Sequence, residues 1–217
     1  MNDKYQTADP RTPNQVGKDV IISPDTERAS RIPPGQSRTQ KWPVLQAGLV
    51  PSIPKDQWQL HIYGLVQKRT EYGWNTFRKL PQVKVYSDFH CVTKWSRLDN
   101  VWQGVSTQEL LNHSGIQPTA RFVILHGYDD GWTTNLPIDE FLANDALLAH
   151  SHDGRPLDDE HGGPVRAVVP CLYAWKSAKW ICGIELVSQD SPGYWERAGY
   201  HDLGNPWKEQ RFRSPTP

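Results

Sequence analysis

The feature that most constrains the fold of this chain is a set of short strand-like segments spread along its length. Some alternate apolar and polar residues, which is typical of a half-buried strand, and others are short apolar runs, which are typical of a buried one. Proline or glycine closes several of them, so the segments stay short. They lie at residues 58–63, 83–86, 122–125, 165–169 and 180–186. We therefore expect strands to outnumber helices.

Helical signals are fewer and shorter. Ser106 and Glu109 form a capping box, and Gly115 is placed to end the helix that it opens. One helical turn is expected over 75–80 and another helix start over 137–142, while residues 150–156 are expected to be loop. With no internal repeat and no heptad, these patterns predict an α+β fold, mixed and β-rich, in a single domain over residues 41–217.

Residues 1–40 differ from the rest of the chain. They are polar and contain five prolines among few aliphatic residues, which is typical of an extended arm rather than an independent domain: Pro10, Pro13, Pro24, Pro33 and Pro34. For the first half of this arm, a partly ordered tail is as consistent with the sequence as a functional role. We expect the second half, from Arg31, to pack on the body, and the aromatic tail from Ser191 to wrap irregularly over it.

Composition excludes several classes of function. Lys plus Arg and Asp plus Glu both total 24, so no net field favours nucleic acid or an anionic membrane. The mean hydropathy of −0.67 and the absence of a long apolar run predict no transmembrane helix. The N-terminal residues show no secretory or twin-arginine pattern, and three cysteines do not make a disulfide framework, so we expect a cytoplasmic protein. The ten tryptophans are residues that often line sites.

Cys91 is the residue around which the candidate chemistry gathers. It follows the expected strand 83–86 and stands in the run DFHCVTKWSR, after which no strand or helix period is sustained. Positive neighbours lower the pKa of a thiol, so His90, Lys94 and Arg97 predict a thiolate at Cys91. A thiolate is both a nucleophile and a metal ligand. This stretch alone leaves both roles open, beside that of a small buried apolar side chain.

The remaining cysteines and the histidines carry weaker signals. Cys171 and Cys182 are not spaced like a metal motif, and Cys182 is expected in the core of a strand. His150, His152 and His161 raise the possibility of zinc, but a zinc site needs three or four converging ligands. Acidic residues beside these histidines favour solvated loop positions instead.

Four motifs occur in a fixed order and together go beyond generic pattern. They are CVTKWS at 91–96, TTNLP at 133–137, GGPVR at 162–166 and KSAKW at 176–180. Together they resemble the sulfite-oxidase superfamily of molybdopterin-dependent oxidoreductases. The likeness is greatest to its haem-free bacterial branch, which includes the catalytic subunit of the methionine-sulfoxide reductase system. The resemblance runs from about Trp42 to the end and implies a sulfite-oxidase-type molybdopterin-binding fold.

The resemblance implies roles for individual residues. Cys91 matches the ligand cysteine, which holds molybdenum together with the dithiolene sulfurs of one pterin. Arg166 matches the pterin-binding arginine, and His161 stands where the reductase branch has an asparagine. His126 lies near another contact of the cofactor. The phosphate end of the pterin is expected to bind to Lys176, Ser177, Ala178 and Lys179.

The substrate side is defined less narrowly. A cation near the molybdenum would polarise an oxyanion or sulfoxide, and Arg97 or an arm arginine (Arg28, Arg31 or Arg38) is a candidate. Tyr173 is a candidate hydrogen-bond donor to the substrate. The expected protein is a mononuclear molybdenum oxidoreductase with molybdenum-molybdopterin as cofactor and without haem. It would transfer an oxygen atom to or from a small sulfur or nitrogen compound.

The sequence and the family resemblance also predict the partners and leave one alternative function. No Cys-x-x-Cys-His motif is present, so electrons are expected to pass through a separate partner protein. A monomer or weak dimer is expected, without nucleic acid. The alternative is a non-enzymatic molybdopterin carrier that has lost redox turnover, and the molybdenum content of the purified protein distinguishes the two.

Overall fold

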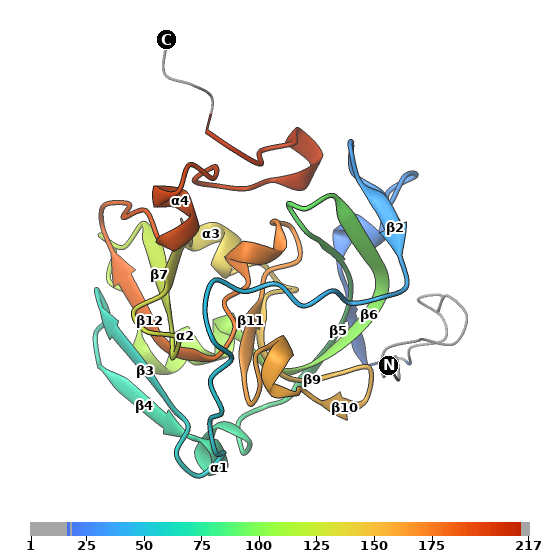
Figure 1. Cartoon of the computed structure of the whole chain (residues 1–217). Helices are drawn as coiled ribbons and strands as arrows, with labels where there is room; N and C mark the ends of the chain where they lie inside the picture. Colours follow the sequence, from blue (N-terminus) through green and yellow to red (C-terminus); the bar gives the residue numbers. More distant parts are fainter. Residues whose placement is uncertain (1–16, 18, 214–217) are drawn as a thin grey trace.

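Two β-sheets and a few short helices make up the computed structural model, which describes residues 17 and 19–213. The sheets lie on opposite sides of the view in Figure 1, with β3, β4, β7 and β12 on one side and β5, β6 and β9 on the other. The expected β-rich α+β fold is therefore confirmed. The expectation for the first half of the arm concerns mostly residues outside the described part.

The first sheet has seven strands in the order β1-β5-β6-β9-β10, with β2 paired to β6 and β11 paired to β9. The arm supplies two of them, because β1 pairs parallel with β5 and β2 pairs parallel with β6. The strands are β1 (Val20–Ile22), β2 (Ser37–Thr39), β5 (Val83–His90), β6 (Trp95–Ser106), β9 (Leu147–His152), β10 (Arg155–Pro156) and β11 (Arg166–Val168).

The second sheet has five strands in the order β4-β3-β12-β7-β8. Its strands are β3 (Gln59–Gly64), β4 (Thr70–Gly73), β7 (Phe122–Gly127), β8 (Thr133–Pro137) and β12 (Ile181–Val187). The helices are α1 (Trp74–Phe77), α2 (Thr107–Ser114), α3 (Ile138–Phe141) and α4 (Tyr194–Arg197). Single 3₁₀ turns are η2 (Pro24–Glu27), η3 (Asp159–His161), η4 (Ala174–Lys176) and η5 (Pro206–Lys208).

The capping signals predicted α2 correctly. The hydroxyl of Ser106 accepts a hydrogen bond from the Glu109 amide at 3.1 Å, and the Gly115 amide donates to Leu111 O at 2.8 Å. Gly115 has φ +66°, a left-handed conformation that favours glycine at the end of a helix. The expected turns over 75–80 and 137–142 form as α1 and α3.

Two hydrophobic cores support the two sheets. The larger core includes Leu60 and Ile62 of β3, which lie on one strand face as their alternation predicted. The smaller core lies against the first sheet, where Trp42 packs edge-on against Trp102 with ring centroids 5.3 Å apart. Trp42 thereby anchors the long connection between β2 and β3, which crosses from one sheet to the other (Figure 1).

Three local expectations were wrong. The strand before Cys91 extends from Val83 to His90, and a strand of 12 residues, β6, follows the turn where no period was recognised. Both faces of β6 carry buried residues, so its sequence shows no alternation. His150 and His152 lie in β9 and are only 4% exposed, so they are not solvated loop residues.

Cys182 also departs from its expected position. A β-bulge between Ile181 and Gly183 shifts the register of β12 against β7. Because of this shift Gly183 and Ile184 are both buried, and Cys182 is only half-buried instead of lying in the core. No helix in the described part of the chain is long and apolar enough to cross a membrane.

Candidate functional site

A cavity of about 250 Å³ lies against the Cys91 turn and joins the sequence motifs. Its walls come from the β2–β3 connection, the Cys91 turn, the segment from His161 to Trp180, and the C-terminal tail. Its lining residues include Trp42, Leu45, Ala47, Cys91, Thr93, Trp95, Asp129, His161, Arg166, Trp175, Ser177, Lys179, Trp195 and Tyr200. Cys91 and Lys179, which lie far apart in the sequence, thus face one cavity.

Cys91 sits in the hairpin turn between β5 and β6. The Cys91 amide donates to Trp95 O at 2.9 Å, and the Lys94 amide donates to Cys91 O at 3.0 Å. Lys94 has φ +70°, the left-handed conformation that ends a three-residue hairpin loop. The Thr93 hydroxyl lies 3.2 Å from the Cys91 Sγ, so it can donate to the sulfur. Local backbone pairing therefore fixes the direction of the thiol.

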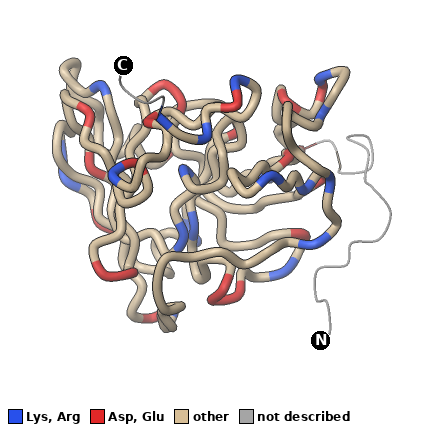
Figure 2. Tube along the Cα trace, turned by 45° about the horizontal axis from the view of Figure 1, so that its top comes forward, with Lys and Arg blue, Asp and Glu red and all other residues tan. Residues whose placement is uncertain are grey.

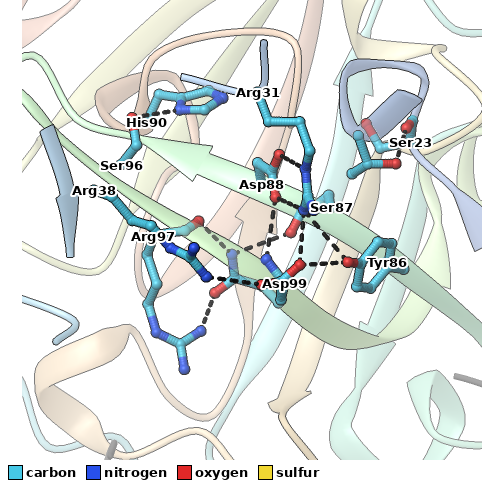
Figure 3. Close-up of polar contacts among 12 residues, drawn as sticks. Ser23, Arg31, Arg38, Tyr86, Ser87, Asp88, His90, Ser96, Arg97 and Asp99 are labelled. Atoms are coloured by element: carbon cyan, nitrogen blue, oxygen red, sulfur yellow. Dashed lines mark hydrogen bonds and ion pairs between the residues drawn. The ribbon is translucent and has the colours of Figure 1, made fainter. Parts of the chain in front are cut away.

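The expected activation of Cys91 by its neighbours is not what the structure shows. Burial raises the pKa of the Cys91 thiol, while hydrogen bonds from Thr93 and Val92 and the charge of Arg211 partly oppose this rise. His90 points to the other side of β5, where its Nδ1 lies 2.8 Å from Ser96 Oγ (Figure 3). Burial lowers the pKa of His90 to about 4, so it is neutral near pH 7. A bound metal would be the natural means of holding this buried sulfur as a thiolate.

Arg166 organises the middle of the cavity. Its guanidinium donates to His161 O at 3.0 Å and to Ser177 O at 2.9 Å, so it ties two of the motif segments together. It also lies over the rings of Trp42 and Phe89, at 5.6 and 5.2 Å from their centroids. Burial lowers the pKa of Arg166 to about 9, which keeps it a cation at neutral pH.

His161 stands beside Arg166 in the wall. Its Nδ1 lies 2.9 Å from Asp158 Oδ1, and its Nε2 lies 3.2 Å from Trp42 O. The His161 ring rests on the Trp42 ring, with centroids 3.8 Å apart. His161 can therefore present only its ring face and edge to a bound group, because both nitrogens have protein partners.

Lys179 and Ser177 also line the cavity. The Lys179 ammonium donates to Glu160 O at 2.8 Å, and burial together with the charge of Arg166 lowers the pKa of Lys179 to about 7. Gly162 makes this approach possible, because a Cβ there would lie 2.9 Å from Lys179 Cβ. Ala178 is fully buried, and its carbonyl accepts from the Ala167 amide. Two adjacent cations and a serine make a suitable site for an anionic group.

Lys176 does not reach the cavity. It is 0% exposed, and its Nζ lies 2.6 Å from Glu196 Oε1, which is also 0% exposed. The same ammonium donates to Asn135 O at 2.6 Å. The sequence motif placed Lys176 with Lys179, but the structure uses it to join η4 to α4 and β8.

His126 lies away from the cavity as well. It projects from the second sheet, where its Nε2 lies 3.1 Å from Tyr63 OH and 3.0 Å from Glu185 Oε2. Among the described residues, no group of three or more His, Cys, Asp or Glu side chains is arranged to hold a metal ion. The structure therefore offers Cys91 alone, of the residues considered, as a soft ligand facing the cavity.

The candidate substrate arginines are engaged elsewhere. Arg97 is 2% exposed and pairs with Asp153 at 2.9 Å, with further bonds to Asn100 and His152. Arg31 reaches two buried carboxylates, with its Nη2 2.6 Å from Asp88 and 2.8 Å from Asp99 (Figure 3). Arg38 pairs with Asp99, and Arg28 pairs with Asp25. Arg28, Arg31 and Arg38 hold the arm in place, and Arg97 stabilises the start of β6. None of the four lines the cavity.

Tyr173 lies behind the cavity wall, stacked on Trp175 with ring centroids 5.3 Å apart. Its side chain is buried, and its hydroxyl has no hydrogen-bond partner within the described structure. The Arg211 guanidinium lies over the Tyr173 ring, 5.1 Å from the centroid. Arg211 also donates to Val92 O and to Pro34 O, both at 3.1 Å. Arg211 therefore ties the Cys91 turn to the arm and the tail.

Aromatic residues complete the cavity, and of its tryptophans only Trp95 and Trp180 belong to the sequence motifs. Six of the ten tryptophans line it: Trp42, Trp95, Trp132, Trp175, Trp180 and Trp195. Tyr200 lines it as well, in a part of the tail that carries no motif. The unusual tryptophan content was the one signal that could have indicated these walls.

Comparison with known proteins agrees with this arrangement. A family model described as "Oxidoreductase molybdopterin binding domain" matches residues 47–195, which include Cys91, Arg166 and Lys179. The chain belongs to this family. The protein is thus a molybdopterin-binding oxidoreductase, as the four motifs indicated.

Three relatives illustrate the range of the family. YuiH of Bacillus subtilis, described as an uncharacterised oxidoreductase, is 47% identical over 188 residues, covering 86% of this chain and 94% of that protein. The methionine-sulfoxide reductase catalytic subunit MsrP of Ralstonia nicotianae is 28% identical, covering 75% of this chain and 52% of its own length. Rat mitochondrial sulfite oxidase is 25% identical, covering 70% of this chain and 33% of its own length.

A solved structure supports the fold. The sulfane dehydrogenase SoxCD of Paracoccus pantotrophus aligns with a TM-score of 0.60 and 21% sequence identity. The alignment covers 64% of this chain and 40% of that one. At this identity the likeness concerns the fold alone. The fold of this chain is therefore shared, over the aligned part, with a solved structure.

The residues present fit a molybdenum-pterin cofactor. The cavity is lined by the thiol of Cys91 and by the basic side chains of Arg166 and Lys179. Its wall also contains polar atoms that are buried without a partner in the described structure, Trp95 Nε1 and Asp129 Oδ1. Burial raises the pKa of Asp129 to about 6, so this carboxyl can readily carry a proton toward a bound acceptor. A donor and a carboxyl of this kind match the hydrogen-bonding edge of a pterin.

Proposed function

We propose that this protein is a mononuclear molybdenum oxidoreductase that transfers an oxygen atom to or from a small sulfur or nitrogen compound. The observation that carries the proposal is that Cys91, Arg166 and Lys179 line one cavity. A soft thiolate suits molybdenum, and the two cations suit the phosphate of the pterin. When bound, the cofactor supplies two-electron oxygen-atom transfer.

The protein's own residues would bind and orient the cofactor. Cys91 would supply the single protein sulfur, held in direction by the backbone pairing of its turn. Arg166 keeps the His161 and Ser177 segments at a fixed separation, and Lys179 offers a charge at the phosphate end. The buried tryptophans around them exclude water from the pterin.

The charges of the cavity favour a neutral substrate over an anion. Among the lining residues the cations are Arg166 and Lys179, with neutral His161 beside them, and these belong to the cofactor end. Beside Cys91 the walls are largely aromatic, and Arg97 is bonded to Asp153 outside the cavity. Arg211, whose charge reaches the Cys91 thiol, is bonded to Val92 O and Pro34 O, and Lys94 is exposed to solvent, so an anion such as sulfite would lack a free cation inside the cavity. A sulfoxide or N-oxide is therefore the better fit, and its reduction consumes two electrons and two protons and releases water.

A substrate panel tests this proposal. Holoenzyme is assayed with reduced methyl viologen as donor and sulfoxides or N-oxides as acceptors, and with ferricyanide as acceptor and sulfite as donor. We expect turnover of a sulfoxide or N-oxide to exceed that of sulfite. Sulfite as the best substrate would contradict the substrate assignment. Purified protein without molybdenum and pterin, from a host replete in molybdenum, would contradict the enzyme proposal itself.

The electron route is also a proposal. The described residues contain no second cluster of metal ligands. Electrons are therefore proposed to come from a separate protein, as single-electron steps that together supply the pair needed for each oxygen atom transferred. The name of the relative MsrP, a catalytic subunit, is consistent with such an arrangement.

A further inference from the structure

The exposed apolar side chains of this protein are concentrated at one place. In the described part of the chain, large apolar residues with high exposure are Val44 (37%), Leu45 (50%), Leu49 (92%), Tyr194 (42%) and Phe212 (60%). Single exposed apolar residues scattered over a surface need no explanation, but a concentrated group marks an interaction site. The position of these five relative to the cavity is therefore informative.

All five lie at or near residues that line the cavity. Leu45 lines it, and Val44 and Leu49 flank the lining residues of the same connection, which includes Ala47. In the C-terminal tail, the rings of Tyr194 and Trp195 lie 5.1 Å apart. Phe212 packs in the same way on Tyr200, at 5.2 Å, and both Trp195 and Tyr200 line the cavity. The cavity mouth thus has an apolar rim from two segments of the chain.

Positive charges lie next to this rim. Lys41 directly precedes Trp42, and Lys94 directly follows Thr93, so each adjoins a lining residue. Both lysines are exposed, and neither forms an ion pair with a described carboxylate. Elsewhere Lys and Arg are interspersed with Asp and Glu along the trace (Figure 2), consistent with a net charge of zero. Two exposed lysines without a described acidic partner therefore lie beside lining residues of the cavity.

The turn that carries Cys91 also reaches the surface beside the cavity. Thr93 is exposed and lines the cavity only two residues from Cys91. Electron transfer slows steeply with distance, so a donor protein gains most by docking where the ligand turn reaches the surface. An apolar centre with a charged margin is typical of protein interfaces, and the charges mainly accelerate and orient the encounter.

We propose that the cavity mouth is the docking surface for a small electron-carrier protein with an acidic face and an apolar centre. The inference rests on the proposed function, because it concerns the partner that supplies its electrons. Each carrier molecule is oxidised by one electron per encounter, and two encounters reduce one sulfoxide or N-oxide. Leu49 is the apolar contact, and Lys41 and Lys94 attract the acidic face.

Two donors separate this inference from the proposed function. Holoenzyme is assayed with reduced methyl viologen, a small dye, and with reduced flavodoxin, used as a probe protein with an acidic surface. We expect both to support turnover, and we expect the KM for flavodoxin to rise with ionic strength. In Leu49→Ser and in Lys41→Glu that KM should rise about tenfold, whereas viologen turnover stays unchanged. Lys84→Glu, an exposed lysine of β5, is the matched control and should behave as wild type.

Each outcome tests either the docking surface or the proposed function. Two results overturn the docking surface but leave the proposed function intact. One is turnover with viologen but not with flavodoxin. The other is an equal KM for flavodoxin in wild type, Leu49→Ser and Lys41→Glu. Absence of turnover with either donor counts against the proposed function. The protein should also remain in the supernatant when vesicles of phosphatidylglycerol are pelleted. Sedimentation that Leu49→Ser abolishes, with flavodoxin kinetics unchanged, shows that the mouth contacts a membrane and overturns the proposal.

Discussion

Replacement of Lys176 tests whether this lysine is structural or holds the cofactor. The residue lies within the motif that resembles a phosphate-binding segment, yet its ammonium is buried against Glu196. Lys176→Met removes the charge and keeps a side chain of similar length. Glu196 would then be buried as an unpaired carboxylate, and one of its oxygens already has no hydrogen-bond partner within the described structure.

The expected cost is large. Breaking a buried ion pair by removing one partner costs about 3–5 kcal/mol, because the remaining charge is left without compensation. Thr134 and Trp175 still donate to Glu196 at 2.8 and 2.9 Å, which favours the lower end of that range. For a chain of this size a loss of about 3 kcal/mol lowers the melting temperature by roughly 10 °C.

Urea unfolding of cofactor-free protein, followed by tryptophan fluorescence, measures this loss. Lys176→Met combined with Glu196→Gln should recover most of the stability, because no unpaired charge remains buried. Lys179→Met is the matched comparison, because its ammonium reaches only one described carbonyl. That variant should lose less than about 1 kcal/mol and instead bind molybdopterin more weakly. A Lys176→Met protein of wild-type stability that has lost its pterin would refute this reasoning.

Three further predictions concern other parts of the structure. Burial lowers the pKa of His150 to about 4 and of His152 to about 3. The unfolded chain binds these protons first, at about pH 6.5, so stability should fall as the pH falls from 6.5 toward 4, by up to about 1.4 kcal/mol per pH unit for each histidine. Urea midpoints from about pH 7.5 to 5 measure the slope, which should decrease but not vanish in His150→Gln, because His90, with a pKa lowered to about 4, and His152 still contribute. Arg211→Ala should speed amide exchange in the Cys91 turn, because it removes the bond to that turn, whereas an unchanged rate would contradict the tie. Arg31→Met should cost about 2 kcal/mol, less than a fully buried pair because Arg31 is 23% exposed, and limited proteolysis should cut the arm faster than in wild type.

The sequence predicted those parts of the fold whose signals are local. The capping box at Ser106 and the alternation over Leu60 and Ile62 depend on neighbouring residues, and both appear as expected. β6 was missed because a strand buried on both faces has no alternation to recognise. His152 was misassigned for a related reason, because the packing that buries it comes from Trp42 and Trp102, far away in sequence.

The sequence motifs predicted which backbone segments form the site. They did not predict the direction of side chains that depend on a partner far away in sequence. Cys91, Arg166, Ser177 and Lys179 all line the cavity as the motifs implied. Lys176, three residues from Lys179, turns away because Glu196 of the tail offers it a buried partner. Such long-range pairs leave no local pattern. The charge near Cys91 was missed for the same reason, since Arg211 approaches from the far end of the chain.

The coordination of molybdenum is the most direct test of the central claim. X-ray absorption at the molybdenum edge counts the sulfur atoms bound to the metal in holoprotein and in Cys91→Ser, with pterin content measured on the same samples. We expect Cys91→Ser to retain pterin, because Arg166 and Lys179 still hold it, and to show one sulfur ligand fewer at molybdenum. An unchanged number of sulfur ligands in Cys91→Ser would show that another group holds the metal. It would contradict the assignment of Cys91 as the molybdenum ligand.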